Sequence, residues 1–494
     1  MPDDYHTRQQ NYALYVRDRW NTTKKLTLTY GLRWEYFPYP TRTDRGLEWY
    51  DGSQNKMLVC GVGTVHKDCG VHVSKKLFAP RVGFAYRPTE TLVIRAGYGI
   101  TFDPFSLQRP FRTNYPVLLI QNITAANAFA SIGKLSDGLP AIRTPDLGNG
   151  VIDVPGTFAV ITTPKDFNRG YIQSWNFTIQ KQLRGGFTGQ AGYVATRSTR
   201  QLGYLDINSG QVIGLGNAGR PYQAKYGRAA ATTLITPFGT TQYNSLQASL
   251  QRRFSGGMQL EANYTWSKVI GYAVNSDSSP NFVQALPYFE MNRVVADYDR
   301  THMLHINQIW DLPFGKGHRL AQSGVPAAIL SGWRISQLWT FYTGLPFSVS
   351  ASGTSLNMPN ATQRADQVKP SVEIRGSAGR GMAYFDPLAF AAVTDARFGT
   401  AGYRSLRGPG AVNWDFGVKR IFYITERYQL TFNADAFNFS NTPHFANPGA
   451  NVSNLDVSGG VVRTNGYAEI TGVQNFGRDG IDERQIRLGL RLRF

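Results

Sequence analysis

Hydrophobic and polar residues alternate with a period of two along many segments of the chain. At the carboxy terminus, Ile486, Leu488, Leu490, Leu492 and Phe494 alternate with Arg487, Gly489, Arg491 and Arg493. A helix would spread these arginines around its circumference, whereas a strand places them all on one face. This segment is therefore predicted to be a β-strand with one apolar and one polar face.

The same alternation recurs in segments 26–37, 258–268 and 427–438, where Thr, Gln, Asn, Asp and Glu occupy every second position. These polar sides are too regular for the buried core of a sandwich, and they suit a wet lumen. The chain as a whole is predicted to contain thirteen strands. They are expected near 11–20, 26–37, 77–87, 91–103, 171–183, 187–196, 242–254, 258–268, 299–311, 333–344, 412–424, 427–438 and 482–494.

The connections between these strands alternate in length. The short ones are 22–25, 88–90, 184–186, 255–257 and 425–426. The long ones are 38–76, 104–170, 197–241, 269–298, 345–411 and 439–481, and only 312–332 breaks the alternation. Short turns on one side and long loops on the other are typical of outer-membrane barrels. The predicted fold class is all-β, an antiparallel transmembrane β-barrel of the outer membrane with long extracellular loops.

The amino-acid composition is compatible with the predicted β-barrel. The 494 residues include 51 glycines, 26 tyrosines and 29 phenylalanines, and no stretch approaches the ~18 apolar residues of a membrane helix. The mean hydropathy of −0.30 would indicate a soluble protein. That inference fails for a barrel, in which lipid-facing and lumen-facing residues alternate and average out.

The net charge of +19 raises the alternative of a soluble basic β-protein that binds nucleic acid or another polyanion. The basic residues are spread along the chain and form no dense block. A basic lumen and basic loops are the preferred interpretation, with no nucleic-acid partner.

Two cysteines, Cys60 and Cys69, lie in one polar segment of loop 38–76. Because that loop is expected to face the outside, an oxidising environment favours a disulfide between them. His66 and His72 lie nearby, but the spacing matches no known zinc pattern, so no metal site is predicted.

No motif supports catalysis. Residues 214–219 fit the pattern GxGxxG, but they neither follow a predicted strand nor open a predicted helix, and they are interpreted as a flexible loop. Gly315-Lys316 lacks the other residues of a phosphate loop, and Asp297 and Asp299 are expected to form a solvated loop edge. The chain is therefore predicted not to be an enzyme and to carry no cofactor.

Several segments resemble the Oar-like barrel of TonB-dependent receptors. They are LFAPRVGFAY (77–86) with VIRAGYGITFD (93–103), YNSLQASLQRRFSGGMQLEANYTWSK (243–268), DRTHMLHINQIWDLPFGKG (299–317), SGWRISQLWTFYTGLPFSV (331–349), SLRGPGAVNWDFGVKRIFYITERYQLTFNADAFNFSNTPHFANP (405–448), NFGR (475–478) and RQIRLGLRLRF (484–494). The resemblance implies a transporter of about 22 strands with a plugged lumen, in which TonB uses the proton gradient to move the plug.

The same resemblance shapes the domain prediction. Plug, TonB-contacting and signal-peptide patterns are not found in 1–494, so these residues are expected to form a partial barrel domain. TonB would then act only through the missing plug region. The alternating residues Ile486, Leu488, Leu490, Leu492 and Phe494 resemble the signal read by the barrel-assembly machinery.

Three hypotheses follow for a protein expected in the outer membrane of a Gram-negative-type bacterium, in contact with its lipid. The first is a transporter barrel whose long loops, above all 104–170 and 345–411, catch an unknown extracellular ligand. The second is a surface adhesion or structural barrel without transport. The third is the soluble polyanion-binding protein.

Overall fold

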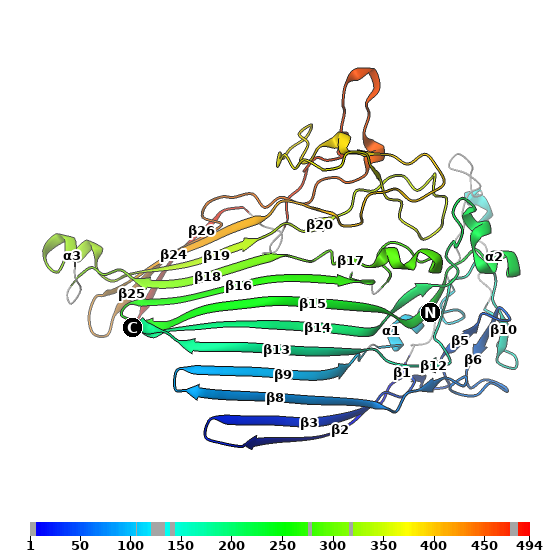
Figure 1. Ribbon diagram of the computed structural model, residues 1–494, viewed down its shortest axis with the longest axis horizontal. Helices are drawn as coiled ribbons and strands as arrows, with labels where there is room; N and C mark the ends of the chain where they lie inside the picture. Colours follow the sequence, from blue (N-terminus) through cyan, green and yellow to red (C-terminus); the bar gives the residue numbers. More distant parts are fainter. Residues whose placement is uncertain are drawn as a thin grey trace.

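A single antiparallel sheet dominates the computed structural model, which describes residues 6–104, 106–119, 134–138, 144–274, 279–315, 320–474 and 483–494. Thirteen long strands, called the wall below, follow each other in the sheet in chain order (Figure 1). They are β2 (Tyr12–Asn21), β3 (Leu26–Tyr36), β8 (Leu77–Thr89), β9 (Leu92–Phe102), β13 (Tyr171–Gln182), β14 (Phe187–Asp206), β15 (Thr232–Ser255), β16 (Met258–Gly271), β18 (His302–Asp311), β19 (Trp333–Tyr342), β24 (Ala411–Tyr423), β25 (Gln429–Phe437) and β26 (Gln485–Arg493). The predicted strands and their antiparallel order are confirmed.

Shorter elements occupy the connections. The short strands are β1 (Thr7–Arg8), β4 (Thr41–Arg42), β5 (Glu48–Asp51), β6 (Lys56–Val59), β7 (His72–Val73), β10 (Val151–Asp153), β11 (Val160–Thr162), β12 (Asp166–Phe167), β17 (Val294–Val295), β20 (Pro346–Phe347), β21 (Asp366–Gln367), β22 (Phe390–Ala391) and β23 (Leu406–Arg407). The α-helices are α1 (Gln108–Phe111), α2 (Pro221–Tyr226) and α3 (Gly324–Leu330). The 3₁₀ turns are η1 (Leu135–Asp137), η2 (Arg184–Gly186), η3 (Gly216–Gly219), η4 (Leu286–Asn292), η5 (Pro387–Ala389), η6 (Val452–Asn454) and η7 (Ser458–Gly460). Within the described ranges, no helix is long and apolar enough to cross a membrane.

The strand register divides the wall into an apolar and a polar face. Residues that pair across neighbouring strands share a face, because the side-chain period of a strand is two. Leu246 pairs with Trp266 on the apolar face, whereas Gln247 pairs with Thr265 on the polar face. At the far edge, Leu490 pairs with Phe432 and Gly489 pairs with Asn433. The alternation in the sequence therefore keeps one consistent face across the wall.

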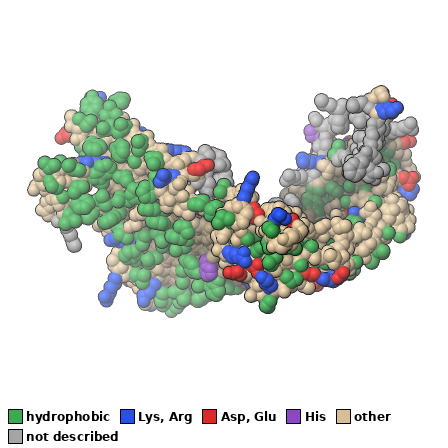
Figure 2. Space-filling view, turned by 90° about the horizontal axis from the view of Figure 1, so that it is seen from above, with side chains coloured by type: hydrophobic (Ala, Val, Ile, Leu, Met, Phe, Trp, Pro, Cys, Tyr) green, Lys and Arg blue, Asp and Glu red, His purple; other side chains and the backbone are tan. Residues whose placement is uncertain are grey.

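The two ends of the wall differ. Turns of a few residues join the strands at one end, called the turn end, as at Gly256–Gly257, where φ values of +57° and +81° suit a tight turn that glycine adopts without strain (Figure 1). Long loops lie at the other end, called the loop end. Seen from above, hydrophobic side chains cover much of the strands near the turn end, and the loop end has a mixed surface (Figure 2).

Two strands extend further than the sequence predicts. β14 and β15 continue to Asp206 and back to Thr232, well past the predicted limits at residues 196 and 242. Their pairing crosses an irregularity near Thr199 and Gln201, and β11 adds to β15 as a parallel strand. The predicted ends of these two strands were wrong. Hydrogen bonds between β14 and β15, and not an alternation of apolar and polar residues, keep the extension in the sheet.

The sheet has two open edges among the described residues. β2 pairs only with β3, and β26 pairs only with β25. Every residue of β2 is exposed, and almost every residue of β26 is. The backbone N–H and C=O groups that point outward along these strands are available for pairing with further strands.

Parts of several sequence interpretations lie outside the described residues. They include the segment 475–478 of the family resemblance, Lys316 of the discounted phosphate loop, and stretches of loops 104–170, 269–298 and 439–481.

The face assignment yields a prediction at the last strand. Leu490 is 71% exposed on the apolar face, so Leu490→Arg should cost about 2–4 kcal/mol of folding free energy if it lies near the bilayer midplane. Gly489→Ser, one residue away on the polar face, should have a small effect because a hydroxyl is compatible with a wet lumen. Urea unfolding of the protein purified from outer membranes and reconstituted into lipid vesicles measures both. Equal losses for the two variants would contradict the assignment.

Candidate functional site

The long loops pack into a folded structure at the loop end, called the loop cap below. In its amino-terminal part, Leu47, Phe111, Phe167, Leu202 and Ile235 form one buried cluster that unites loops 38–76 and 104–170 with the extended hairpin. In its carboxy-terminal part, a second cluster contains Phe347, Phe385, Phe390, Tyr467 and Ile470. Because such clusters exclude water, they hold the loops in fixed positions relative to the wall.

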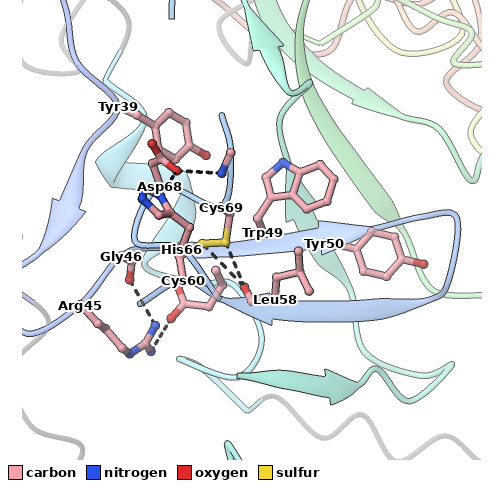
Figure 3. Close-up of a disulfide and its surroundings, with 12 residues drawn as sticks. Tyr39, Arg45, Gly46, Trp49, Tyr50, Leu58, Cys60, His66, Asp68 and Cys69 are labelled. Atoms are coloured by element: carbon pink, nitrogen blue, oxygen red, sulfur yellow. Dashed lines mark hydrogen bonds and ion pairs between the residues drawn. A yellow bond between two sulfur atoms is a disulfide. The ribbon is translucent and has the colours of Figure 1, made fainter. Parts of the chain in front are cut away.

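A disulfide closes the tip of the first loop. Cys60 and Cys69 are bonded, with their Cα atoms 5.3 Å apart (Figure 3). The amide of Gly46 donates to the carbonyl of Cys60 (2.8 Å), and the Lys165 ammonium donates to the carbonyl of Cys69. The ammonium also lies over the Trp49 ring, 3.7 Å from its centroid. The disulfide therefore closes a turn within loop 38–76, and the contacts of Lys165 connect this loop to loop 104–170.

A buried carboxylate lies beside the disulfide. Glu48 is fully buried, and its Oε1 accepts a hydrogen bond from Nη2 of Arg45 at 2.5 Å, with Arg42 3.8 Å away. Burial raises the pKa of Glu48, and the two arginines oppose that shift. These contacts stabilise the chain that leads into the disulfide loop.

Each of the two histidines near the cysteines lies beside one carboxylate, His66 beside Asp68 and His72 beside Asp166. Nδ1 of His66 lies 2.6 Å from Oδ1 of Asp68, and both side chains are exposed. In the part of the chain that the structure describes, no three His, Cys, Asp or Glu side chains come together in a group that could hold a metal ion.

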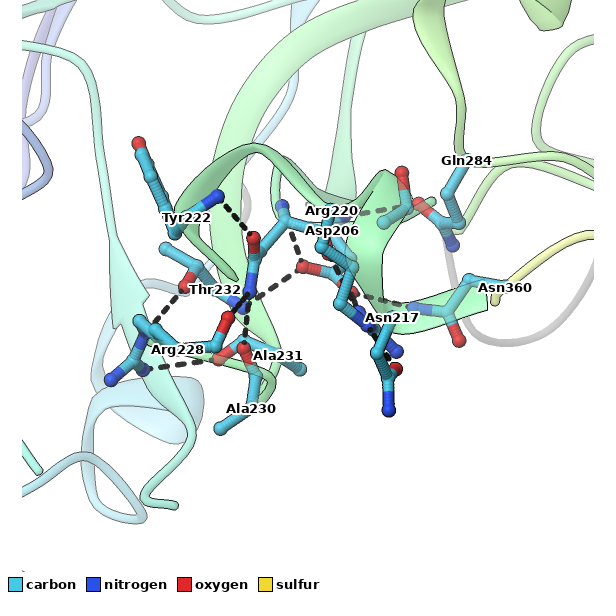
Figure 4. A network of polar contacts seen from close by, with 12 residues as sticks. Asp206, Asn217, Arg220, Tyr222, Arg228, Ala230, Ala231, Thr232, Gln284 and Asn360 are labelled. Atoms are coloured by element: carbon cyan, nitrogen blue, oxygen red, sulfur yellow. Dashed lines mark hydrogen bonds and ion pairs between the residues drawn. The ribbon is translucent and has the colours of Figure 1, made fainter. Parts of the chain in front are cut away.

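A polar network connects three loops above β14 and β15 (Figure 4). Oδ1 of Asp206 accepts hydrogen bonds from the amides of Asn208 and Thr232, both at 2.9 Å. Oδ2 of the same residue accepts from Nδ2 of Asn360 at 2.6 Å. One buried carboxylate thus positions the extended hairpin and loop 345–411 relative to each other.

Arg228 forms the second centre of this network and is completely buried. Its guanidinium donates to Oγ1 of Thr232 (3.1 Å) and to the carbonyls of Pro155 (3.2 Å) and Phe158 (2.5 Å). Burial lowers the pKa of this guanidinium and raises the pKa of the neighbouring Tyr50 hydroxyl to about 12. Arg228 thereby joins loop 197–241 to loop 104–170.

The GxGxxG segment belongs to the same region and corrects the prediction of a flexible loop. The amide of Gly214 donates to Leu356 (3.0 Å), and that of Gly216 donates to Asn357 (2.8 Å). The segment forms the turn η3, and α2 follows because Pro221 starts a helix readily. The glycines allow two loop backbones to approach closely.

Asp299 also differs from the prediction of a solvated edge. It is buried, accepts from the amide of Val269 at 2.7 Å and is paired with Nη2 of Arg407 at 2.5 Å. Asp297 remains half exposed, 3.6 Å from Arg404. Tertiary contacts with loop 345–411 bury Asp299, and these are invisible in the local sequence.

A cavity lies in the carboxy-terminal part of the loop cap. It has a volume of about 660 Å³ and lies between residues 375–387 and 462–471. Arg375, Arg380, Arg463, Thr464 and Glu469 are among the residues that line it. Most of its charges are balanced, since Arg463 is 3.2 Å from Asp456 and Arg375 is 3.5 Å from Asp386. The lining therefore offers several hydrogen-bonding groups and carries charges of both signs.

The sequence did not identify these cavity residues. They come from two loops about ninety positions apart, in segments without regular alternation. The signal in the sequence was the presence of three arginines, Arg375, Arg380 and Arg463, in these two segments. The bridge between Ala383 and Glu469 shows how the fold brings the two segments together.

Below the loop cap, the polar face of the wall carries amides, hydroxyls and arginines. Near β2, this face includes Arg17, Arg33 and Arg81, and Nη1 of Arg95 donates to Oε1 of Gln180 at 2.6 Å. Farther along the wall, Ser249 pairs with Asn263. Side chains of these types are hydrated readily, so the polar face suits a water-filled lumen.

The predicted assembly-signal residues all lie at the open edge. Ile486, Leu488, Leu490, Leu492 and Phe494 are exposed on one face of the last strand and its terminal residue. No other element covers them within the described part of the chain, and their role remains a prediction.

An antiparallel wall with one apolar and one polar face, short turns at one end and a folded loop cap at the other, defines a transmembrane β-barrel protein. The chain belongs to the outer membrane beta barrel domain family, whose model matches residues 2–487. It is therefore a protein of the outer membrane, in contact with lipid, and the hypothesis of a soluble polyanion-binding protein was wrong.

The fold is similar to that of a solved outer-membrane transporter. The outer membrane transporter YddB from Escherichia coli superimposes with a TM-score of 0.51 at 11% identity, over 98% of this chain and 45% of that chain. The siderophore receptor PiuA from Acinetobacter baumannii gives 0.44 at 10% identity, over 99% and 43%. The iron transporter FrpB from Neisseria meningitidis gives 0.45 at 10% identity, over 98% and 45%. The chain thus spans less than half the length of each.

The resemblance to TonB-dependent transporters is therefore confirmed at the level of the fold. The family is one of outer-membrane β-barrels, and the similar structure with a TM-score of 0.51 is that of an outer membrane transporter. None of the curated proteins matches the chain by sequence.

The disulfide leads to a prediction about the loop cap. Replacing both Cys60 and Cys69 by serine should destabilise loop 38–76 locally by about 2–3 kcal/mol, because a covalent constraint on the unfolded loop is lost. The wall should stay folded, since its hydrogen bonds lie elsewhere. Hydrogen exchange should accelerate around residues 46–72 and remain unchanged in β8 and β9. Free thiols in protein isolated from outer membrane, or loss of the wall, would contradict the prediction.

Proposed function

We propose that this chain is the carboxy-terminal part of the barrel of a TonB-dependent receptor, which binds an extracellular ligand at its loop cap and admits it through the lumen. One observation carries the proposal: a wall with a consistently polar inner face is covered at one end by folded loops. A polar lumen gives a hydrophilic ligand a path across the apolar layer, and the cavity near Arg380 gives it a place to bind.

The open edges support the further proposal that residues 1–494 form a partial barrel domain. Unpaired amides and carbonyls on β2 and β26 would cost several kcal/mol per group in lipid. Both strands also run in the same direction, because an even number of antiparallel steps separates them. Additional strands are therefore expected between them. A complete barrel of about 22 strands would add about nine, together with a plug through which TonB acts.

A second candidate function is a surface adhesion or structural barrel without transport. The extensive packing of the loop cap favours it, since the disulfide and the buried Arg228 network give the loops a stable outer surface. The two candidate functions make different predictions about the lumen. In a transporter, solvent access to the lumen changes with the proton gradient, whereas in a structural barrel it does not.

The transport function can be tested with two neighbouring residues of β15. In cells, a cysteine in place of Gln247, on the polar face, should react with a membrane-impermeant thiol reagent, and one in place of Leu246, on the apolar face, should stay protected. Energised plug movement predicts that a protonophore slows the reaction at position 247. A rate that does not depend on the proton gradient would support the structural barrel instead.

The partial-barrel proposal has its own test. The 494-residue chain, refolded alone in detergent, should lack the shift in gel mobility on heating that closed barrels show, because its two edges cannot close in antiparallel register. A compact, protease-resistant barrel from this chain alone would overturn the proposal.

We also expect the terminal strand to be read by the barrel-assembly machinery. Deleting Phe494, which is exposed at the end of the apolar row, should slow assembly and lower the amount of protein in the outer membrane. Arg493→Gln, on the polar face, serves as the matched control and should assemble normally. Normal levels of the Phe494 deletion, measured by quantitative blotting of outer membranes, would rule out the signal.

A further inference from the structure

The connection between β18 and β19 is unlike the other connections at the turn end. Those others are short and mostly contain glycine or charged residues, such as Gly256–Gly257 and the segment around Glu426. Between Leu320 and Gly332, by contrast, the chain has no charged residue and contains the helix α3. This segment lies outside the wall at the turn end (Figure 1).

The apolar side chains of this segment are exposed. Val325 is 70% and Ile329 is 58% exposed, and Leu320 and Leu330 are also exposed. Val325 and Ile329 are four positions apart, so they lie on the same face of α3. A helix with such a face is unfavourable in water, since each exposed branched side chain forgoes the free energy of burial.

α3 is fixed to one specific face of the wall. Nη1 of Arg420 donates to the carbonyl of Ile329 at 2.8 Å, and Nη2 donates to the carbonyl of Ala328. Nε1 of Trp333 also donates to Ile329 at 2.8 Å. These carbonyls end the helix and have no partners within it, so a cation satisfies them and complements the helix dipole.

The strand register shows which face this is. Trp333 pairs with Arg420, Arg420 pairs with Phe432, and Phe432 pairs with Leu490. All four side chains therefore belong to the apolar, lipid-facing side of the wall. The Arg420 guanidinium lies over the rings of Trp333 and Phe422, with centroid distances of 5.3 and 4.5 Å. Arginine flanked by aromatic rings is typical of the border between lipid and water.

We propose that residues 320–332 form an interfacial anchor whose α3 helix lies in the periplasmic leaflet of the outer membrane, with Val325 and Ile329 among the acyl chains. The occupant of this surface is lipid because the exposed face of α3 continues the lipid-facing row that begins at Trp333. Short turns mark the periplasmic side of such barrels, which assigns the leaflet. Arg420 acts as the tether that holds the helix against the wall.

Single cysteines carrying an environment-sensitive fluorophore test this proposal in the protein purified from outer membranes and reconstituted into phospholipid vesicles. Cys60 and Cys69 are bonded to each other, so an added cysteine is the one reactive thiol within residues 1–494. Probes at Val325→Cys and Ile329→Cys should show blue-shifted emission and be quenched by lipid-attached quenchers placed near the headgroups. Leu490→Cys provides the reference for lipid contact, and Glu426→Cys, in a charged turn at the same end, provides the reference for water.

Quenching of both α3 probes by aqueous iodide, to the same extent as at position 426, would overturn the proposal. Shielding that appears in native membranes but not in vesicles would also overturn it, because a protein partner would then cover α3. Arg420→Met should abolish lipid quenching at position 329, whereas Lys419→Met, on the polar face beside it, should leave it intact. Unchanged quenching in Arg420→Met would refute the tether.

Discussion

The requirement that every backbone N–H and C=O within a membrane finds a partner governs this structure. Water cannot satisfy these groups in the hydrocarbon layer, so each strand must pair with its neighbours along its whole crossing. The antiparallel ladder from β2 to β26 meets this requirement apart from a few irregularities, such as that near Gln201, and the two outer strands each pair on one side among the described residues. The alternation of faces, the short turns and the proposed additional strands all follow from the same constraint.

Outside the apolar layer the constraint is relaxed, and other interactions determine the structure. The loop cap is held by hydrophobic clusters around Phe111 and Phe385, by the Cys60–Cys69 disulfide, and by buried polar groups such as Asp206 and Arg228. A buried arginine is stable there because several carbonyls accept its hydrogen bonds. The wall can thus form the sides of the lumen, and the loop cap, whose shape depends on contacts particular to this chain, can cover one end.

At the border between the apolar layer and water, the side chain of Arg420 contacts both regions. Arg420 occupies a lipid-facing position, yet its guanidinium bonds to the carbonyls that end α3 and lies over two aromatic rings. An arginine can do this because its long apolar stem lies along the wall and its charged group reaches the interface. The connection 312–332, which breaks the alternation of short and long connections, has a physical role in the proposed anchor.

The sequence alone determined the wall: period-two alternation placed Leu490 and Gly489 on opposite faces, and the lengths of the connections separated the turn end from the loop end. It could do so because a membrane strand is specified by which of its own residues face lipid. Only the tertiary structure decided the extension of β14 and β15, the burial of Asp299, the folding of the GxGxxG segment and the cavity near Arg380. These features depend on contacts between loops far apart in the chain, and no local pattern of residues encodes such contacts.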